Sequence, residues 1–376
     1  MAMQKICFLG LDDLPVLAPE FDRHGVGGEQ VQHTLLARSL ARRGHQTSMV
    51  VYDYGQPDRA SWSRVTTYKA YRQDAGTPVL RFLHPRLTGI WSAMARADAD
   101  VYYLSCAGMQ LGLAAVFCRL HRRRVVFRVA HDADCQPDAL LVTYWRDRKL
   151  YEYGLRRADA ILVQSWQQQQ ALLRNYGLAS EIAGMLVEFP DQIATAAARD
   201  IDVLWVNNLR DFKRPGLFLA LARRLPGLRL DMIGGPQPHH QGLYNDTARQ
   251  ADALPNLHFH GPVSYQSVAG YYARARLFVN TSSTEGFPNS FLQAWARGTP
   301  VISFFDPDGV IRREGLGLAV DSIDAMLAAI HHFGTDDAAW SAASARCRHY
   351  MDLAYREDQV LAPYLRLLDT QPENSR

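Results

Sequence analysis

Apolar and polar positions follow one another in the first half of the chain in an order typical of strand, loop and helix units. Residues 6–9 form a short apolar run, and from Glu29 apolar positions recur at helical spacing as far as Gly44, which suits the end of a helix. Residues 47–54 are typical of the next strand. Further strands are expected at 98–106, 124–132 and 159–165, and helices at 108–121, at 143–157 and, after the last of these strands, up to about Asn175. This order predicts a parallel sheet covered by helices.

A second series of the same kind begins after residues 185–200. Strands are expected at 202–208, 228–235, 256–261, 276–282 and 299–305, and helices at 215–225, 264–275 and 290–297, with the strand at 299–305 closing the sheet. The pattern therefore predicts two doubly wound, Rossmann-like α/β domains with parallel sheets, at residues 1–185 and 186–354. Because such sheets bind ligands at the carboxyl ends of their strands, we expect the site in a cleft that the two domains face across.

The composition agrees with two folded domains. Of the 376 residues, 48% are apolar and 21% are charged, and at roughly 100–200 residues per domain the length suits two. The net charge of +3 is too small for a dedicated nucleic-acid-binding protein, so no nucleic-acid partner is expected.

The N-terminus and the cysteines indicate a cytoplasmic protein. The opening residues, MAMQKICFLGLDD, reach two aspartates after a short apolar run, unlike a signal peptide, and no stretch approaches the ~18 apolar residues of a membrane span. The five cysteines are odd in number and form no CxxC pair, which favours free thiols in a reducing compartment.

The segment at 278–302, FVNTSSTEGFPNSFLQAWARGTPVI, carries the most chemical information. Its strand is followed by a loop that contains Glu285, then by the turn GFPNS and a helix. The N-terminus of a helix presents unpaired N–H groups and a positive dipole end, which suit a diphosphate. Glu285, just ahead of this helix, is placed to accept hydrogen bonds from sugar hydroxyls.

The turn and the start of the helix form a candidate donor-binding set. Gly286 allows a close backbone approach and Pro288 stiffens the turn. Asn289 or Ser290 is expected to cap the helix, and Gln293, about two turns further on, is placed to reach a ribose. The set comprises Gly286, Phe287, Pro288, Asn289, Ser290 and Gln293. A capped helix on a Rossmann-like sheet, with a merely solvated carboxylate ahead of it, explains the same residues.

The string SSTEGFPNSFLQAWARGTPVI resembles the donor-binding segment of glycosyltransferase family 4. That family has a glutamate, seven further residues and then a second glutamate. Glu285 matches the first glutamate, which in the family contacts the transferred sugar. Gln293 stands at the second position and departs from the pattern, which puts the donor nucleotide in question more than the reaction class. The resemblance implies the GT-B fold, with two Rossmann-like domains facing across a cleft.

Two segments of the first half resemble the same family. HGVGGEQVQHTLLARSLARRGH is similar to its glycine-rich loop and first helix, where Gly27, Gly28 and Glu29 match a GGxE-like pattern that approaches the donor phosphates and the acceptor. VVFRVAHDADC is similar to the strand that ends in a His-Asp pair, so His131, followed by Asp132, matches the family histidine near the transferred sugar.

The string DVLWVNNLRDFKRP resembles the first strand and loop of the family's donor domain, which bears an arginine and a lysine near the diphosphate. Lys213 matches the lysine. The arginine position holds Asn208, and Arg210, two residues later, is expected to take over its role because a guanidinium suits phosphate. A solvated basic loop that includes Arg210 and Arg214 is the simpler alternative.

Two further strand ends resemble the lining of the nucleobase pocket. MIGGPQP and HFHGPVSYQSV make Gly234, Gly235, Gly261 and Val263 candidates. Residues 355–376 resemble the last helix of the fold, which crosses back to the first domain, with a polar tail after it.

The resemblance implies a retaining transfer by front-face attack, in which the leaving phosphate helps to deprotonate the acceptor. Its catalytic residues would be His131, Glu285, Lys213 and Arg210. The sequence has no metal-binding DxD motif of the usual kind, and DPD at 306–308 is interpreted as a turn, so neither a metal nor a cofactor is expected. The expected donor is a UDP- or GDP-sugar, and the expected acceptor a glycan or a lipid-linked molecule in bacterial surface polysaccharide assembly.

Peripheral membrane contact is a further expectation. The run at 119–128 is basic, and residues 81–98 mix arginine with aromatic and apolar residues, which suits an anionic lipid surface; a solvated helix face explains both as well. The sequence does not indicate the oligomeric state.

Other classes of protein stay open. A nucleotide-sugar epimerase of GT-B architecture would need a pair of acid/base carboxylates, and none is identifiable. A catalytically inactive sugar-nucleotide-binding protein is suggested by Gln293 and Asn208, while the retention of Glu285, His131 and Lys213 argues against it. A dinucleotide-dependent oxidoreductase is disfavoured because the first loop lacks GxGxxG.

Overall fold

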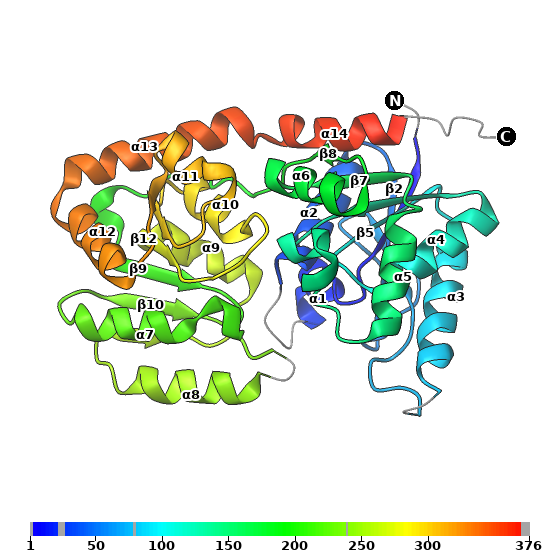
Figure 1. Ribbon diagram of the computed structural model, residues 1–376, viewed down its shortest axis with the longest axis horizontal. Helices are drawn as coiled ribbons and strands as arrows, with labels where there is room; N and C mark the ends of the chain where they lie inside the picture. The colour runs from blue at the N-terminus through cyan, green and yellow to red at the C-terminus, as the bar shows by residue number, and fades with distance from the viewer. Residues whose placement is uncertain (1–2, 22–26, 78–79, 238–239, 370–376) are drawn as a thin grey trace. The chain divides into compact units, whose positions relative to one another are not determined.

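The computed structural model describes residues 3–21, 27–77, 80–237 and 240–369. These residues form two compact α/β units. One unit contains residues 28–186 together with the N-terminal strand and the chain from residue 360 onward, and the other contains residues 187–359. In each unit a parallel sheet packs against helices (Figure 1), which confirms the predicted α/β class.

The first unit is built on a sheet of eight described strands. They are β1 (Lys5–Leu9), β2 (Gln46–Val51), β3 (Ser61–Trp62), β4 (Val65–Lys69), β5 (Val101–Ser105), β6 (Arg124–Arg128), β7 (Ala160–Val163) and β8 (Glu181–Ile182). Their order is β3-β4-β2-β1-β5-β6-β7-β8, and every neighbouring pair is parallel except β3 with β4. The carboxyl ends of the parallel strands therefore share one edge of the sheet.

The helices of this unit follow the strands in sequence. They are α1 (Leu14–Leu17), α2 (Gly28–Arg42), α3 (Thr88–Ala97), α4 (Met109–His121), α5 (Trp145–Leu155) and α6 (Trp166–Tyr176), with a π-helical turn at Phe82–Leu87 ahead of α3. The central strands are buried, as expected for a parallel sheet with both faces covered, and Phe127 and Tyr151 are among the largest fully buried side chains.

The last helix of the chain, α14 (Glu357–Asp369), packs on this first unit. The Tyr364 hydroxyl donates to the carbonyl of Gly184 at 2.9 Å, and Arg124 Nη2 donates to the carbonyl of Leu367 at 2.6 Å. The Tyr364 ring also lies 6.3 Å from that of Tyr103 on β5. Strand β6 and the chain after β8 are thus tied to a segment far away in the sequence.

Helices α4 and α5 approach each other through two glycines. A Cβ atom on Gly112 would lie 2.4 Å from the carbonyl oxygen of Leu150, and one on Gly154 would lie 2.5 Å from the carbonyl carbon of Leu111. Both distances are far below van der Waals contact, so only glycine permits this packing. The contact fixes α5, whose first turn contributes to the pocket described below.

The second unit is built on a sheet of six described strands, all parallel. They are β9 (Ile201–Val206), β10 (Leu230–Ile233), β11 (Leu257–Phe259), β12 (Ala275–Asn280), β13 (Val301–Ser303) and β14 (Gly317–Ala319), in the order β11-β10-β9-β12-β13-β14. Its helices are α7 (Pro215–Arg224), α8 (Gln241–Asp252), α9 (Tyr265–Arg274), α10 (Asn289–Ala296), α11 (Val310–Glu314), α12 (Ile323–Thr335) and α13 (Asp337–Ala354). Figure 1 shows α7 beside β10, with α8 on the other side of α7.

The expectation that the strand at 299–305 closes the second sheet is wrong. β13 pairs on its outer side with β14, a strand of three residues whose Gly317 has a φ of +138°. A Cβ at Gly317 would lie 1.9 Å from the carbonyl oxygen of Val301, so the edge strand depends on a glycine that a search for apolar runs passes over.

Other elements without a clear apolar period also went unpredicted. Helix α8 buries only Thr247 and Ala251 fully, with Leu243 and Tyr244 partly buried beside them, so its apolar face is narrow. Strands β3 and β4 and helix α3 lie in a stretch of mixed character. The interpretation of residues 306–308 as a turn is confirmed by a 3₁₀ turn at Pro307–Gly309.

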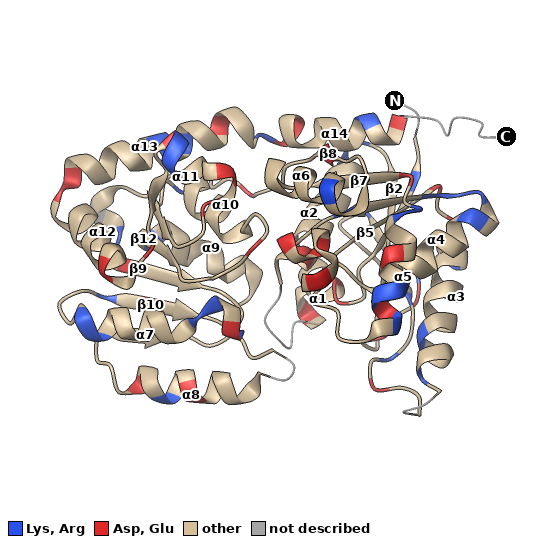
Figure 2. Ribbon diagram, in the orientation of Figure 1, with Lys and Arg blue, Asp and Glu red and all other residues tan. Residues whose placement is uncertain are grey.

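Charge and thiols are as the sequence indicates. Figure 2 shows lysine and arginine interspersed with aspartate and glutamate over both units, in keeping with the net charge of +3. All five cysteines, each of them in the described part of the chain, are free thiols. No described helix is both long enough and apolar enough to cross a membrane.

Replacing Gly154 by alanine is expected to destabilise the first unit by about 1–3 kcal/mol, because the new methyl group overlaps the α4 backbone. Thermal unfolding monitored by circular dichroism measures the loss. The control is Gly216→Ala in α7, where an added Cβ meets nothing within 4 Å and should stabilise by about 0.4–1 kcal/mol. Equal melting temperatures for Gly154→Ala and the wild type would contradict the close packing.

Candidate functional site

The best-defined polar site of the second unit is an ion pair between Lys213 and Glu285. The parallel strands β9 and β12 are neighbours, so the loops that follow them leave the same edge of the sheet. Lys213 Nζ lies 2.5 Å from Oε1 and 2.6 Å from Oε2 of Glu285, and the two side chains are only 15% and 8% exposed. The structure thus brings together two of the four predicted catalytic residues, 72 positions apart in the chain.

Hydrogen bonds to the backbone hold the two loops against each other. The Thr281 hydroxyl donates to the carbonyl of Lys213 at 2.7 Å and accepts from Trp205 Nε1 at 2.9 Å. Arg214 Nε donates to the carbonyl of Thr281 at 2.6 Å, and the N–H of Ser283 donates to the carbonyl of Phe212 at 2.9 Å. These bonds position the lysine and the glutamate before any ligand arrives.

Glu285 is ionised at neutral pH. Burial by itself would raise the pKa of its carboxyl, but the Lys213 ammonium and hydrogen bonds from neighbouring side chains outweigh burial and hold the pKa below its ordinary value of 4.5. One of these bonds comes from Asn280 Nδ2, 3.3 Å from Glu285 Oε1. The group is therefore a hydrogen-bond acceptor rather than a proton donor.

The turn after Glu285 leads directly into α10. Gly286, Phe287 and Pro288 are buried, and the helix begins at Asn289. The expectation that Asn289 or Ser290 caps the helix is wrong: both lie inside the first turn, and the cap position falls on Pro288, which has no side-chain acceptor. Gln293 is half-buried further along α10.

Arg210 does not join the ion pair. It is exposed, and its Nη2 donates to Gln237 Oε1 at 3.0 Å. Arg214 is not a solvated loop residue either, because its guanidinium binds the carbonyls of Thr281 and Ser282, the latter at 3.2 Å. Asn208 lies half-buried in the same loop as Arg210.

The candidate nucleobase-lining residues meet where the next two strands end. The N–H of Gly234 donates to the carbonyl of Gly261 at 3.0 Å, and a Cβ on Gly234 would lie 2.4 Å from the carbonyl oxygen of Asn207. Gly261 has a φ of +64°, a conformation that favours glycine, and Gly235 accepts a bond from the N–H of Leu209. Val263, half-buried, follows in the loop before α9.

In the first unit, His131 caps a short 3₁₀ turn just beyond β6. Its Nδ1 accepts from the N–H of Ala133 at 3.0 Å, so a neutral ring carries its proton on Nε2. The carboxylate of Asp134 accepts from the N–H groups of Ala130 and His131, both at 3.0 Å, and fixes the backbone there. Burial raises the pKa of Asp134 to about 6.

Asp132, which follows His131 in the predicted His-Asp pair, accepts a hydrogen bond from Gln168 Nε2 at 2.9 Å.

The glycine-rich loop is described only from Gly27. α2 begins at Gly28, which is exposed, and Glu29 follows in the first turn. The predicted loop residues at 25–26 lie outside the described residues.

A buried polar chain that sequence reasoning missed leads to Glu29. His33 Nδ1 lies 2.8 Å from Asp13 Oδ2, His33 Nε2 lies 2.9 Å from Ser105 Oγ, and the Ser105 hydroxyl donates to Glu29 Oε1 at 3.0 Å. Because a hydroxyl has one hydrogen, all three contacts are satisfied when His33 is an imidazolium. Burial opposes that charge, but Asp13 outweighs it and the pKa of His33 is raised. No spacing in the sequence signals this chain.

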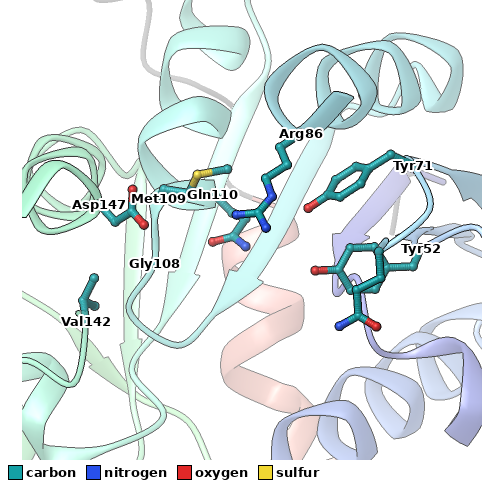
Figure 3. Close-up of a pocket in the computed structure, with 9 residues that line it drawn as sticks. Tyr52, Tyr71, Arg86, Gly108, Met109, Gln110, Val142 and Asp147 are labelled. Atoms are coloured by element: carbon teal, nitrogen blue, oxygen red, sulfur yellow. The ribbon is translucent and has the colours of Figure 1, made fainter. Parts of the chain in front are cut away.

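A pocket of about 230 Å³ lies in the first unit, where β2, β4 and β5 end. Figure 3 shows Arg86 reaching into it, with Tyr52 and Tyr71 to one side and Met109 and Gln110 to the other. Gln73, Gly108, Val142 and Asp147 complete the lining. The Arg86 guanidinium makes no hydrogen bond or ion pair to any other described residue, so the pocket offers a cation to an anionic ligand.

The comparison with known families identifies the class of protein. The model of glycosyltransferase family 4 matches residues 26–183, and the model of glycosyl transferases group 1 matches residues 201–336. With two parallel-sheet units, these matches define a glycosyltransferase of the GT-B type. The chain belongs to glycosyltransferase family 4.

Similar proteins agree with this class. Sucrose-phosphate synthase from Thermosynechococcus elongatus has a TM-score of 0.75 at 18% identity, over 97% of this chain and 98% of that one. HepE from Anabaena, solved in complex with UDP and glucose, has a TM-score of 0.74 at 14% identity, over 98% and 100%. Both show the fold.

A D-inositol 3-phosphate glycosyltransferase from Mycolicibacterium smegmatis is 29% identical over 181 residues. The match covers 44% of this chain and spans only 40% of that relative's length.

Replacing Lys213 by methionine is expected to destabilise the second unit by about 3 kcal/mol at pH 8, because it leaves a buried carboxylate without its cation. In the wild type the pKa of Glu285 is lower in the folded state than in the unfolded state. The ionised Glu285 therefore adds to the free energy of unfolding above about pH 4.5, and this gain is lost as the pH falls below that value. Without the lysine, burial raises the Glu285 pKa, so the variant loses stability as the pH rises. The deficit, which is the loss in free energy of unfolding of Lys213→Met relative to the wild type, should be larger at pH 8 than at pH 5.

Urea unfolding at both pH values measures this deficit. The double variant Lys213→Met, Glu285→Gln is the control, since a neutral amide removes the unpaired charge and should abolish the pH dependence. A deficit of the same size at both pH values in the single variant would show that Glu285 does not depend on Lys213.

Proposed function

We propose that the chain is a retaining, metal-independent glycosyltransferase that transfers a sugar from a UDP- or GDP-sugar to a glycan or lipid-linked acceptor in bacterial surface polysaccharide assembly. The observation that carries the proposal is the buried Lys213–Glu285 pair at the carboxyl ends of β9 and β12. Membership of a glycosyltransferase family supports the reaction class, and the UDP and glucose in the HepE structure support the type of donor.

The ion pair suits a nucleotide-sugar because its two halves match the two parts of the donor. A diphosphate needs a cation, and Lys213 supplies one next to Glu285, in the loop that leads into α10. At the start of that helix, N–H groups and the helix dipole also favour an anion. A phosphate that takes over the lysine releases the Glu285 carboxylate to accept hydrogen bonds from sugar hydroxyls. Donor binding then exchanges one anionic partner of Lys213 for another.

The proposed transfer needs no protein nucleophile. The acceptor hydroxyl oxygen forms a bond to the anomeric carbon on the face from which the diphosphate leaves, and the bond from that carbon to the phosphate oxygen breaks. The hydroxyl proton passes to the departing phosphate. Lys213 stabilises the charge that grows on the diphosphate, and Arg210, with its exposed guanidinium, is the second candidate for this role.

His131 has the chemistry to contact the transferred sugar. Because its Nδ1 is committed to the N–H of Ala133, the neutral ring presents Nε2–H as a donor. Asp134 and the 3₁₀ turn fix the ring's backbone, so the imidazole is oriented without a ligand.

Replacing Glu285 by glutamine is expected to lower the rate of sugar transfer by about 100-fold, because the amide loses the charge that binds sugar hydroxyls and partners Lys213. Nucleotide release from a panel of UDP-, GDP- and ADP-sugars, with and without lipid-linked acceptor, measures the rate. The anomeric configuration of the product, read by NMR, tests retention, and activity unchanged by EDTA tests metal independence.

The control is Glu314→Gln on α11, a surface glutamate paired with Arg313, which should leave the rate unchanged. The proposal fails if no nucleotide-sugar is bound or turned over, and conversion of a nucleotide-sugar without acceptor into an epimer would indicate an epimerase instead.

A further inference from the structure

Exposed apolar side chains gather in two short segments of the first unit. Leu80 is 62% and Leu83 59% exposed in one segment, while Leu141, Tyr144 and Trp145 are 61%, 63% and 77% exposed in the other. Among the described residues, five of the thirteen exposed large hydrophobic side chains thus fall within 80–83 and 141–145. We call these five residues the apolar patch.

The two segments adjoin each other. The Arg146 guanidinium lies 3.4 Å from the centre of the Phe82 ring and 5.9 Å from that of Tyr144, so a single side chain bridges them. Phe82 itself packs on the hydrophobic core and anchors its segment. Because Phe82 is anchored in the core and Arg146 packs on its ring, the leucines and aromatic rings beside them stay exposed to solvent.

The surroundings of the apolar patch are basic. Residues 80–88 and 140–152 contain five basic side chains, Arg81, Arg86, Arg146, Arg148 and Lys149, against two acidic ones, Asp147 and Glu152, a net charge of +3. Both acids are already neutralised, Asp147 by Arg146 and Glu152 by Lys149. Figure 2 shows the alternating blue and red segments along α5. Arg81 is exposed and has no ion pair or side-chain hydrogen bond within the described chain.

This combination matches the headgroup region of an anionic lipid bilayer. Tryptophan and tyrosine place a polar edge in water and a ring among acyl chains, leucines insert beside them, and arginines pair with lipid phosphates. A solvated helix face would not retain five exposed apolar side chains in nine residues. We propose that the apolar patch and its arginines bind the surface of an anionic membrane.

The pocket with Arg86 lies next to this surface, because residues in or directly after the two segments line it. Arg86 lies in the π-helical turn three residues after Leu83, Val142 lies in the second segment, and Asp147 lies in the first turn of α5. Membrane binding would hold the pocket at the headgroup level, where a lipid-linked acceptor presents its phosphate. This step rests on the proposed function and selects a lipid-linked, phosphate-bearing acceptor over a free glycan.

Vesicle flotation tests the proposal directly. The full-length protein is expected to float with vesicles of phosphatidylglycerol and phosphatidylcholine in equal parts, and to stay unbound with phosphatidylcholine alone or at 1 M NaCl, since salt screens the arginines. Trp145→Ser and Leu141→Ser are each expected to reduce the bound fraction by about fivefold or more. Both residues are exposed enough for the variants to fold.

Trp166→Ser is the matched control, an exposed tryptophan (57%) on α6 outside the apolar patch, and it should bind as the wild type does. Brominated lipids should quench wild-type tryptophan fluorescence and spare Trp145→Phe. The proposal is overturned if the wild type does not float with anionic vesicles, or if Trp166→Ser and Trp145→Ser reduce binding equally.

An activity measurement separates this inference from the proposed function. Trp145→Ser should lower transfer to acceptor embedded in vesicles while leaving slow donor hydrolysis, measured without vesicles, unchanged. Absence of any donor turnover in the wild type would defeat the proposed function and leave the flotation result standing. Equal transfer by wild type and Trp145→Ser on vesicle-borne acceptor would defeat the inference alone.

Discussion

The contact between Lys213 and Glu285 is the interaction on which the candidate site depends. Removing two charges from water costs free energy that only their close approach and the surrounding hydrogen bonds offset. The loops after β9 and β12 are accordingly joined by side chains that bind backbone carbonyls: Thr281 binds that of Lys213, and Arg214 binds that of Thr281. Lys213 and Glu285 neutralise each other, so under the proposed function a donor phosphate would have to take the place of Glu285 beside the lysine.

In the first unit, too, buried ionisable groups are held by hydrogen bonds, although no lysine–glutamate pair is involved. At the carboxyl ends of its strands, Asp134 fixes the backbone around His131, and the chain from Asp13 through His33 and Ser105 ends at Glu29. A buried ionisable group is retained only where partners surround it, so each network also fixes the local backbone. Both units therefore have a buried polar network at the carboxyl ends of their strands, the edge of the sheet where ligands of α/β folds bind.

The order of most strands and helices, and the loops that carry Lys213 and Glu285, could be predicted from the sequence because apolar period and motif are local properties. The contact of Lys213 with Glu285 could not, since it depends on which strands are neighbours. His33 was overlooked because a buried polar residue on α2 looks like a break in the apolar face. β14 could not be predicted because it has only three residues. The pocket around Arg86 could not be predicted because its lining comes from segments far apart in the chain.

The packing of α14 on the first unit has a consequence for the order in which the protein forms. The strands of that unit leave the ribosome first, yet their contacts with Tyr364 and Leu367 require nearly the whole chain to have been synthesised. The second unit, whose main part is residues 187–359, needs nothing that follows it in the chain. During translation the unit that begins first is therefore the one completed last.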